Sequence, residues 1–322
     1  MKRRLRIAVA AAMLLCLLPF STLAAEYLIP VGEVIGLHLS DNCVTIAAFD
    51  DLHGAAAKNA GLQIGDEIVA IDGCEIDCAE DVRHALGQTE QAVSIQIRRH
   101  GKLHTLTATP KPTAEGPRLG IYLKQGITGI GTVTWYDPET SRFGALGHGV
   151  SDSSGALLRL VEGNAFEADI LSIKKGQRGE PGQLKGGAQQ MRSCGLLLRN
   201  TPQGVFGISH RKWAGSLCEV AAYSEVKTGS AVILSTVCDQ GAQEYSVEIL
   251  KIYPKDRPDH RNFLLKITDP DLLDTTGGIV QGMSGSPIIQ DGKLVGAVTH
   301  VLVNDPTRGY GIFIENMLDA AG

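Results

Sequence analysis

The sequence predicts a mostly β fold in two parts, a small α+β module followed by a larger all-β domain. Residues 31–110 alternate strand-like and short helical segments, whereas residues 118–322 hold many short apolar strands separated by glycine-rich turns. Between them, residues 110–117 are rich in proline and polar side chains, as a stiff linker is. Many short strands with turn signals are typical of a β-sandwich or a β-barrel. The length of 322 residues also agrees with about two domains.

The first 25 residues have the pattern of a targeting segment. Four basic residues precede an apolar run at residues 7–20, and Ser21–Ala25 resembles a small-residue cleavage site. The run is short for a membrane span, which takes about 17–25 residues. Its extension through Ala25 keeps an uncleaved anchor as the alternative. Either way, we expect the chain after about residue 26 to be exported.

Composition narrows the classes of partner and cofactor. Thirty basic and 35 acidic residues give a net charge of −5, so nucleic acid is not an expected partner. Six of the seven cysteines follow the targeting segment, without the spacing of a disulfide framework. Cys74 and Cys78 are close in sequence but have no histidine nearby, so we expect no metal site and no cofactor. Free thiols are expected, with a few disulfides as the alternative.

The elements of the module follow from periodicity and turn residues. Strands should alternate apolar and polar positions, and helices should repeat apolar positions every three to four residues. On these criteria strands are predicted at residues 44–49, 64–73, 93–98 and 103–109, and helices at residues 54–62 and 78–86.

The run Ala60-Gly-Leu-Gln-Ile-Gly-Asp-Glu-Ile-Val-Ala-Ile-Asp-Gly73 resembles the most recognisable stretch of PDZ domains. The resemblance implies that a peptide C-terminus adds as a strand and that a loop of backbone N–H groups holds its carboxylate. By this resemblance the binding loop falls on Ile35, Gly36, Leu37, His38 and Leu39, although it departs from the common Gly-Leu-Gly-Phe form. A structural module without a ligand is the alternative.

The segment Gly282-Met-Ser-Gly-Ser-Pro-Ile288 has the pattern of a serine nucleophile. Gly282 and Gly285 permit the positive φ of a tight turn, which would expose the hydroxyl of Ser284. The same turn can aim the N–H groups of Gly282 and Ser284 at one point, forming an oxyanion hole. The alternative is a glycine-rich hairpin turn, with Ser286 as a second serine to consider.

A serine hydroxyl needs a base, and histidine is the usual one. His148 lies among small residues in Phe143-Gly-Ala-Leu-Gly-His-Gly149, where a substrate could approach closely. His300 ends an apolar strand and is the alternative base, or a residue of the core or the substrate pocket. We favour His148, because the order histidine before serine is also that of chymotrypsin-like proteases.

The acid that would orient this histidine is left open by the residues themselves. Asp269 follows a strand 15 residues before Ser284, while Asp305, Asp137 and Asp152 are rivals. Any of these aspartates could be a turn residue, since Asp-Pro commonly opens turns.

Several long motifs together resemble the SpoIVB peptidase family. They are Gly129-Ile-Gly-Thr132, the His148 loop, Thr275–Ile289 and Gly292–Pro306. The resemblance implies a chymotrypsin-like double β-barrel after the PDZ-like module, and a catalytic triad of His148, Asp269 and Ser284. It implies a sporulation signalling protease, exported to the space between the forespore and mother-cell membranes. Such a protease would cleave itself and a membrane-bound regulator of an intramembrane protease, leading to sigma-factor activation.

Two other functions compete with this interpretation. One is a quality-control protease of the HtrA kind, in which the PDZ domain follows the protease domain. The other is a PDZ scaffold with an inactive protease domain, which should have lost the serine, the histidine or the glycines. All of these residues are present in the sequence.

Overall fold

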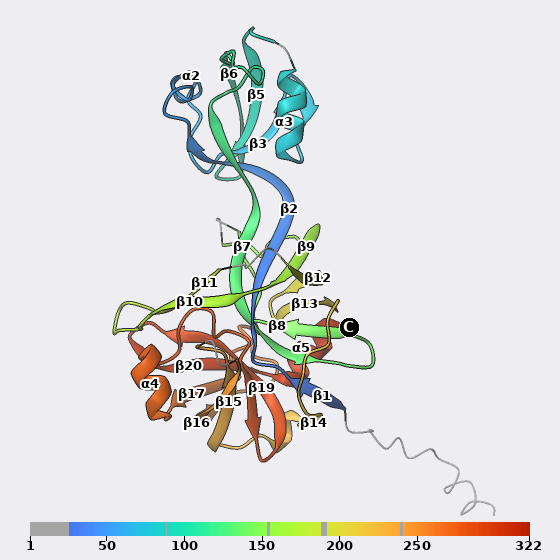
Figure 1. Ribbon diagram of the computed structural model, residues 1–322, viewed down its shortest axis with the longest axis vertical. Helices are drawn as coiled ribbons and strands as arrows, with labels where there is room; N and C mark the ends of the chain where they lie inside the picture. The colour runs from blue at the N-terminus through green and yellow to red at the C-terminus, as the bar shows by residue number, and fades with distance from the viewer. Residues whose placement is uncertain (1–25, 88, 153–154, 188–191, 239–240) are drawn as a thin grey trace, which may run out of the picture.

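The computed structural model describes residues 26–87, 89–152, 155–187, 192–238 and 241–322. The predicted targeting segment at residues 1–25 therefore lies outside the described residues. Strands dominate the chain, which confirms the mostly β prediction, and two barrels lie at one end with a small module at the other (Figure 1). Within the described ranges, no helix is long and apolar enough to cross a membrane.

Six antiparallel strands close barrel 1. In pairing order they are β2, β9, β12, β13, β8 and β7, which returns to β2. Their bounds are β2 Val34–Phe49, β7 Ile121–Tyr136, β8 Arg142–Ala145, β9 Glu162–Glu167, β12 Ser193–Thr201 and β13 Gly204–Ser209. Side chains that alternate inward, such as Val133, Phe143 and Val205, fill the barrel with a buried apolar core.

Barrel 2 is a second ring of six antiparallel strands. Its pairing order is β15, β16, β17, β20, β19 and β18, which returns to β15. The bounds are β15 Gly229–Ser235, β16 Gln243–Ile252, β17 Phe263–Ile267, β18 Pro287–Gln290, β19 Lys293–Leu302 and β20 Asp305–Phe313. Buried Ile233, Leu265 and Val298 contribute to its core. The two rings confirm the predicted double β-barrel.

Short elements tie the barrels together. Strand β1 (Tyr27–Pro30) pairs with β7 of barrel 1 and with β14 (Cys218–Val220), which continues in parallel onto β19 of barrel 2. Helix α5 (Ile314–Ala321) follows β20, and its Met317 shares a buried cluster with Trp135 of barrel 1 and Ile312 of barrel 2. The remaining elements of this part are β10 Asp169–Lys174, β11 Gln183–Gly187, α4 Pro270–Thr276 and a 3₁₀ turn at Tyr223–Glu225.

The module has its own core and follows the predicted order of strands and helices, with one short strand, β4, that was not predicted. Its elements are α2 Ala55–Asn59, β3 Glu67–Ile71, β4 Cys74–Glu75, α3 Ala79–Leu86, β5 Val93–Arg99 and β6 Lys102–Ala108. Asp66 is 1% exposed, and both of its carboxylate oxygens accept hydrogen bonds of 2.6 Å from Arg99. This pairing compensates for burying the charge and fixes the turn before β3.

The predicted boundary of the module, residues 31–110, is wrong at both ends. Residues 34–39 of β2 pair with 127–132 of β7 and with β9 in barrel 1, whereas residues 44–49 pair with 121–125 in the module. Between these parts the chain passes through a bulge, where Asn42 has φ +62°. The module is therefore inserted between two strands of barrel 1, and the 110–117 stretch connects β6 to β7 within it.

The same pairing overturns the predicted peptide-binding loop. Ile35 to Leu39 form a regular strand of barrel 1, and Ile35, Leu37 and Leu39 are buried there. Their backbone groups are used in a sheet ladder with a neighbour on each side, so these residues cannot hold a peptide carboxylate in the module. All six cysteines of the described residues are free thiols.

Candidate active site

The predicted nucleophile turn is a tight turn between α4 and β18. Gly282 has φ +103° and Gly285 has φ +98°, a backbone conformation that favours glycine. A Cβ at Gly285 would lie 2.0 Å from the carbonyl oxygen of Thr132 and 2.6 Å from the amide nitrogen of Leu146. Only glycine therefore allows the turn to approach barrel 1 this closely.

Thr132, a buried residue of β7, anchors this turn across the two barrels. Its hydroxyl donates to the carbonyl oxygen of Gly282 at 2.7 Å, and its N–H donates to the carbonyl oxygen of Ser284 at 2.9 Å. Ser286 is fully buried, and its hydroxyl donates to the carbonyl oxygen of Met283 at 2.8 Å. Sequence reasoning did not give Thr132 a role, although it ends the Gly129–Thr132 motif.

The turn leaves two amide donors free, as an oxyanion hole requires. The N–H of Met283 donates to Val280 and that of Gly285 to Val298. Within the described part of the chain, the N–H groups of Gly282 and Ser284 have no such acceptor. Both residues line the same cavity, where these donors could stabilise a developing negative charge on a carbonyl oxygen.

The His148 loop is held in an unusual backbone conformation. Leu146 and Gly147 have φ +69° and +66°, which turns the chain sharply after β8. A Cβ at Gly149 would lie 2.7 Å from the carbonyl oxygen of Thr201, so this glycine is required by a close approach of β12. The side chain of Asn200 accepts a hydrogen bond from the N–H of Val150 at 2.9 Å and donates one to the carbonyl oxygen of Val150 at 2.8 Å.

Ser284, His148 and His300 meet in one cavity of about 480 Å³. The ring centroids of the two histidines are 5.0 Å apart. The Ser284 hydroxyl donates to the carbonyl oxygen of Thr299 at 2.6 Å, so its proton is not given to His148 in this structure. Catalytic hydrogen bonds of free enzymes often form only when substrate binds. A rotation about the Cα–Cβ bond of Ser284 would redirect the hydroxyl.

Burial disfavours the charged form of both histidines. It lowers the pKa of His148 below its ordinary value of 6.5, against the opposing effect of the Gly149 carbonyl. Burial, followed by the nearby charges of His148 and Arg261, lowers the pKa of His300 to about 4. Nδ1 of His148 lies 2.9 Å from the carbonyl oxygen of Gly149. A proton on Nδ1 would be donated to that oxygen, leaving Nε2 as the proton acceptor.

A lowered pKa of His148 has a consequence for the pH profile. The base must be neutral, and burial disfavours its charged form, so the base form should persist below pH 6.5. We expect the acid limb of kcat/KM to have its midpoint below pH 6.5, measured with a neutral peptide substrate. A midpoint clearly above pH 6.5 would contradict this, because it would require a group that stabilises the imidazolium.

Asp269 is not brought to His148. It caps α4: one carboxylate oxygen accepts from the N–H of Leu272 at 3.0 Å, and the other accepts from the N–H of Ser246 at 3.2 Å. None of the described residues that line the cavity is a carboxylate, so Asp305, Asp137 and Asp152 are not there either. The orienting contact that His148 has in this structure is the Gly149 carbonyl.

Two substitutions separate the capping role of Asp269 from an orienting role. Asparagine keeps the N-cap through its one amide oxygen but cannot also accept from Ser246, so Asp269→Asn should lose less stability than Asp269→Ala and keep most of its activity. Asp269→Ala should lose about 1 kcal/mol of unfolding free energy, measured by urea denaturation. A folded Asp269→Asn variant with kcat reduced roughly 10⁴-fold would instead support the orienting role that the family resemblance implies.

The module has a groove at a different place from the predicted loop. A cavity of about 670 Å³ lies between α3 and the start of β7, lined by Val82, Leu86 and Gly120 among others. Among the described residues, 121–125 of β7 pair with β2 alone, so one strand edge is open beside this cavity. Gly120 has φ +66°, and a Cβ there would lie 2.3 Å from the backbone of His53. Leu119–Tyr122 line this groove, whereas residues 35–39 do not.

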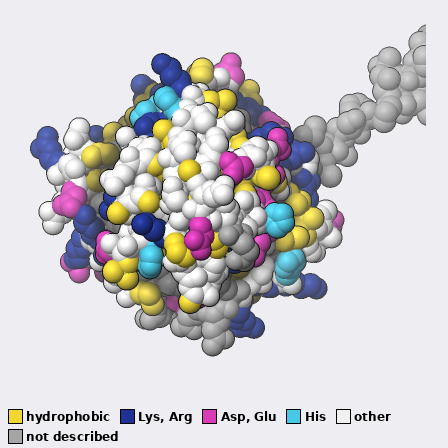
Figure 2. Space-filling model, turned by 90° about the horizontal axis from the view of Figure 1, so that it is seen from above, with side chains coloured by type: hydrophobic (Ala, Val, Ile, Leu, Met, Phe, Trp, Pro, Cys, Tyr) yellow, Lys and Arg dark blue, Asp and Glu magenta, His cyan; other side chains and the backbone are white. Residues whose placement is uncertain are grey.

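Two other surfaces do not carry the chemistry. On the surface at the module end, basic and acidic side chains are interspersed, so the described residues of this face form no patch of one charge (Figure 2).

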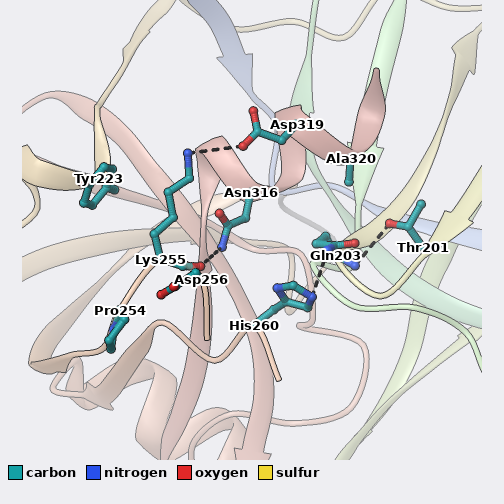
Figure 3. Close-up of a pocket in the computed structure, with 10 residues that line it drawn as sticks. All are labelled: Thr201, Gln203, Tyr223, Pro254, Lys255, Asp256, His260, Asn316, Asp319 and Ala320. Atoms are coloured by element: carbon teal, nitrogen blue, oxygen red, sulfur yellow. Dashed lines mark hydrogen bonds and ion pairs between the residues drawn. The ribbon is translucent and has the colours of Figure 1, made fainter. Parts of the chain in front are cut away.

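A larger pocket of about 800 Å³ lies beside α5 (Figure 3). There Lys255 pairs with Asp319 at 3.3 Å, and Gln203 lies 2.9 Å from His260. Its lining residues include neither Ser284 nor His148. The candidate site is therefore the smaller cavity.

Comparisons with known proteins give a family and partial likenesses. The model of a family described as SpoIVB peptidase S55 matches residues 115–318, well over half of the chain. A Mesorhizobium japonicum protein described as "putative zinc metalloprotease" is 29% identical over 118 residues, covering 36% of this chain and 29% of that protein. A Ralstonia nicotianae protein with the same description is 39% identical over 98 residues, covering 29% and 21%. The chain thus spans less than a third of the length of these relatives.

Solved structures match over larger parts of the chain but loosely. The active form of an M. tuberculosis protease has a TM-score of 0.35 at 14% identity, covering 62% of this chain and 75% of that one. The HtrA-type protease AlgW with a decapeptide has a TM-score of 0.36 at 11% identity, and the match covers 65% of this chain and 57% of AlgW. The fold assignment itself rests on the two closed rings of strands described above.

Proposed function

The chain belongs to the SpoIVB peptidase S55 family and is a serine peptidase, and from this premise we propose its regulatory role. It is an exported endopeptidase that cleaves itself and a membrane-associated regulator of an intramembrane protease. That cleavage triggers sigma-factor activation during sporulation, in the space between the forespore and mother-cell membranes. The N-terminal segment directs export or anchors the chain to the membrane.

The observation that carries the chemistry is the meeting of Ser284, His148 and two free amides in one cavity. Oγ of Ser284 attacks the scissile carbonyl carbon while Nε2 of His148 takes the hydroxyl proton. The N–H groups of Gly282 and Ser284 donate to the oxyanion that forms. His148 then gives its proton to the leaving amine, and an acyl-enzyme remains. Water, activated in the same way by His148, hydrolyses the ester and regenerates Ser284.

The module controls when and what the peptidase cuts. Its groove and the open edge of β7 have the features that capture an extended chain end by adding a strand. The captured segment belongs to the regulator or to a second copy of this chain, and its capture raises the local substrate concentration. Strands β2 and β7 also continue from the module to the catalytic cavity, where Leu37 and Ile127 form part of its wall. A ligand in the module would therefore act on strands that the active site shares.

Mapping of new chain ends tests this proposal. The purified exported chain and its Ser284→Ala variant are incubated alone and with the candidate regulator, and new termini are identified by mass spectrometry. We expect self-cleavage and regulator cleavage only with the wild-type chain. Identical termini from both proteins would mean that a contaminating protease made them, and the absence of any cleavage by the wild-type chain would refute the proposed autoproteolysis.

A further inference from the structure

The catalytic cavity has two aliphatic walls that the chemistry at Ser284 does not explain. One wall comes from barrel 1, where Leu37 and Leu39 on β2 face the cavity with Ile127 on β7. The other comes from the segment before the nucleophile, Ile279 and Val280, with Val301 of β19. Leu37, Leu39, Ile279 and Val280 are each at most 3% exposed, so these walls are fixed by the barrel cores rather than by mobile surface side chains.

Strand register explains why the barrel 1 wall is continuous. Leu37 is paired with Gly129, and Leu39 with Ile127, across the β2–β7 ladder. Paired residues lie on the same face of a sheet, as do residues two apart along each strand. These four residues therefore form one patch of the ladder, and all four line the cavity.

The cavity offers no partner for a charged side chain. Its described lining residues include no Lys, Arg, Asp or Glu, and its two half-buried histidines both have a lowered pKa. A charged side chain placed there would lose its hydration without gaining an opposite charge, whereas an aliphatic one would be removed from water favourably. The volume of about 480 Å³ is within the usual range of about 300–1,000 Å³ for binding pockets.

We propose that this cavity binds the side chain of the substrate residue whose carbonyl Ser284 attacks, and that it selects Leu, Ile, Val or Met over charged residues there. This side chain has to lie close to Ser284, because it and the carbonyl carbon that Ser284 attacks are bonded to the same Cα. In serine proteases the pocket beside the nucleophile sets specificity for this residue, and an apolar slot selects apolar side chains. The inference rests on the proposed peptidase function and names its substrate class.

Gly129 offers a way to change the size of the cavity. A Cβ added there would have no atom within 4 Å, and the backbone of this strand residue is not in the positive-φ region. Leucine at this position would extend from the Leu37 face into the open space of the cavity. The neighbouring Thr128 is a matched control, because it points to the opposite face of β7, where its hydroxyl lies 3.1 Å from Nδ1 of His38, and it does not line the cavity.

The test uses the full chain and a peptide series that varies only the residue before the scissile bond. We expect kcat/KM for the leucine peptide to exceed those for the lysine and glutamate peptides at least tenfold, because the cavity would bury their charge without an opposite charge beside it. Gly129→Leu should lower the ratio of kcat/KM for the leucine peptide to that for the alanine peptide about tenfold. Thr128→Leu should keep the wild-type ratio.

Labelling of Ser284 with a fluorophosphonate probe separates failure of this inference from failure of the proposed function. A wild-type chain that reacts with the probe but prefers lysine or glutamate peptides would overturn the inference and leave the peptidase intact. An equal drop of the ratio in Gly129→Leu and Thr128→Leu would also overturn it. If the wild-type chain neither labels nor cleaves, the proposed function fails and the inference fails with it. If Gly129→Leu does not fold, the comparison of leucine, lysine and glutamate peptides with the wild-type chain still tests the inference.

Discussion

The Ser284→Ala variant should fold and should lose its activity by a factor of roughly 10⁴ or more in kcat, because the acyl-enzyme forms on the Ser284 hydroxyl. In the folded protein the Ser284 hydroxyl makes one hydrogen bond, to the carbonyl oxygen of Thr299. Its loss should cost about 1 kcal/mol of unfolding free energy. Self-cleavage, cleavage of a peptide substrate and labelling by a fluorophosphonate probe measure the change in activity, and thermal unfolding checks the fold.

Ser286→Ala is the matched control for this prediction. Ser286 is fully buried, and its hydroxyl bonds to Met283 at 2.8 Å and to the hydroxyl of Ser235 at 3.1 Å. Removing it should destabilise the chain by about 1–3 kcal/mol while leaving Ser284 able to react with the probe. A labelled Ser284→Ala variant together with an unlabelled, folded Ser286→Ala variant would move the nucleophile to Ser286.

The His148→Ala variant should be about as inactive as Ser284→Ala. His148 and Ser284 act as a unit, so removing either one abolishes the same step, and the double variant should be no slower than either single one. Steady-state rates of the three variants on one peptide test this non-additivity. A double variant that is slower than both single variants by the product of their effects would show that the two residues act independently.

His300→Ala is the control for the choice of histidine. Its ring lies 5.0 Å from that of His148 in the same cavity, and its Nδ1 is buried without a hydrogen-bond partner among the described residues. We expect a milder loss, through the shape and hydration of the cavity around His148. An active His148→Ala variant beside an inactive, folded His300→Ala variant would reverse the assignment of the base.

Local patterns predicted much of the fold and of the site. The order of strands and helices in the module was correct, and the start of α3 at Ala79 and of β5 at Val93 lies within one residue of the prediction. The turn at Gly282 and Gly285 was also predicted, since positive φ at a glycine depends on residues next to it in sequence. The closed barrels were expected as a class from many short strands, which have to pair with one another.

The sequence by itself determined which side chains carry the chemistry: a serine in a glycine turn and a histidine in a glycine-walled loop. The tertiary structure alone decided what surrounds them. The anchor of Thr132 on Gly282 joins residues 150 positions apart, and no local pattern specifies such a partner. The family resemblance implied Asp269 as the orienting acid, yet its carboxylate accepts from the N–H of Leu272 as the cap of α4 and from the N–H of Ser246 in β16. The module boundary was missed because β2 and β7 each run from the core of barrel 1 into the core of the module. The alternation of apolar and polar residues is the same in both parts of such a strand, so the sequence pattern does not mark where one core ends.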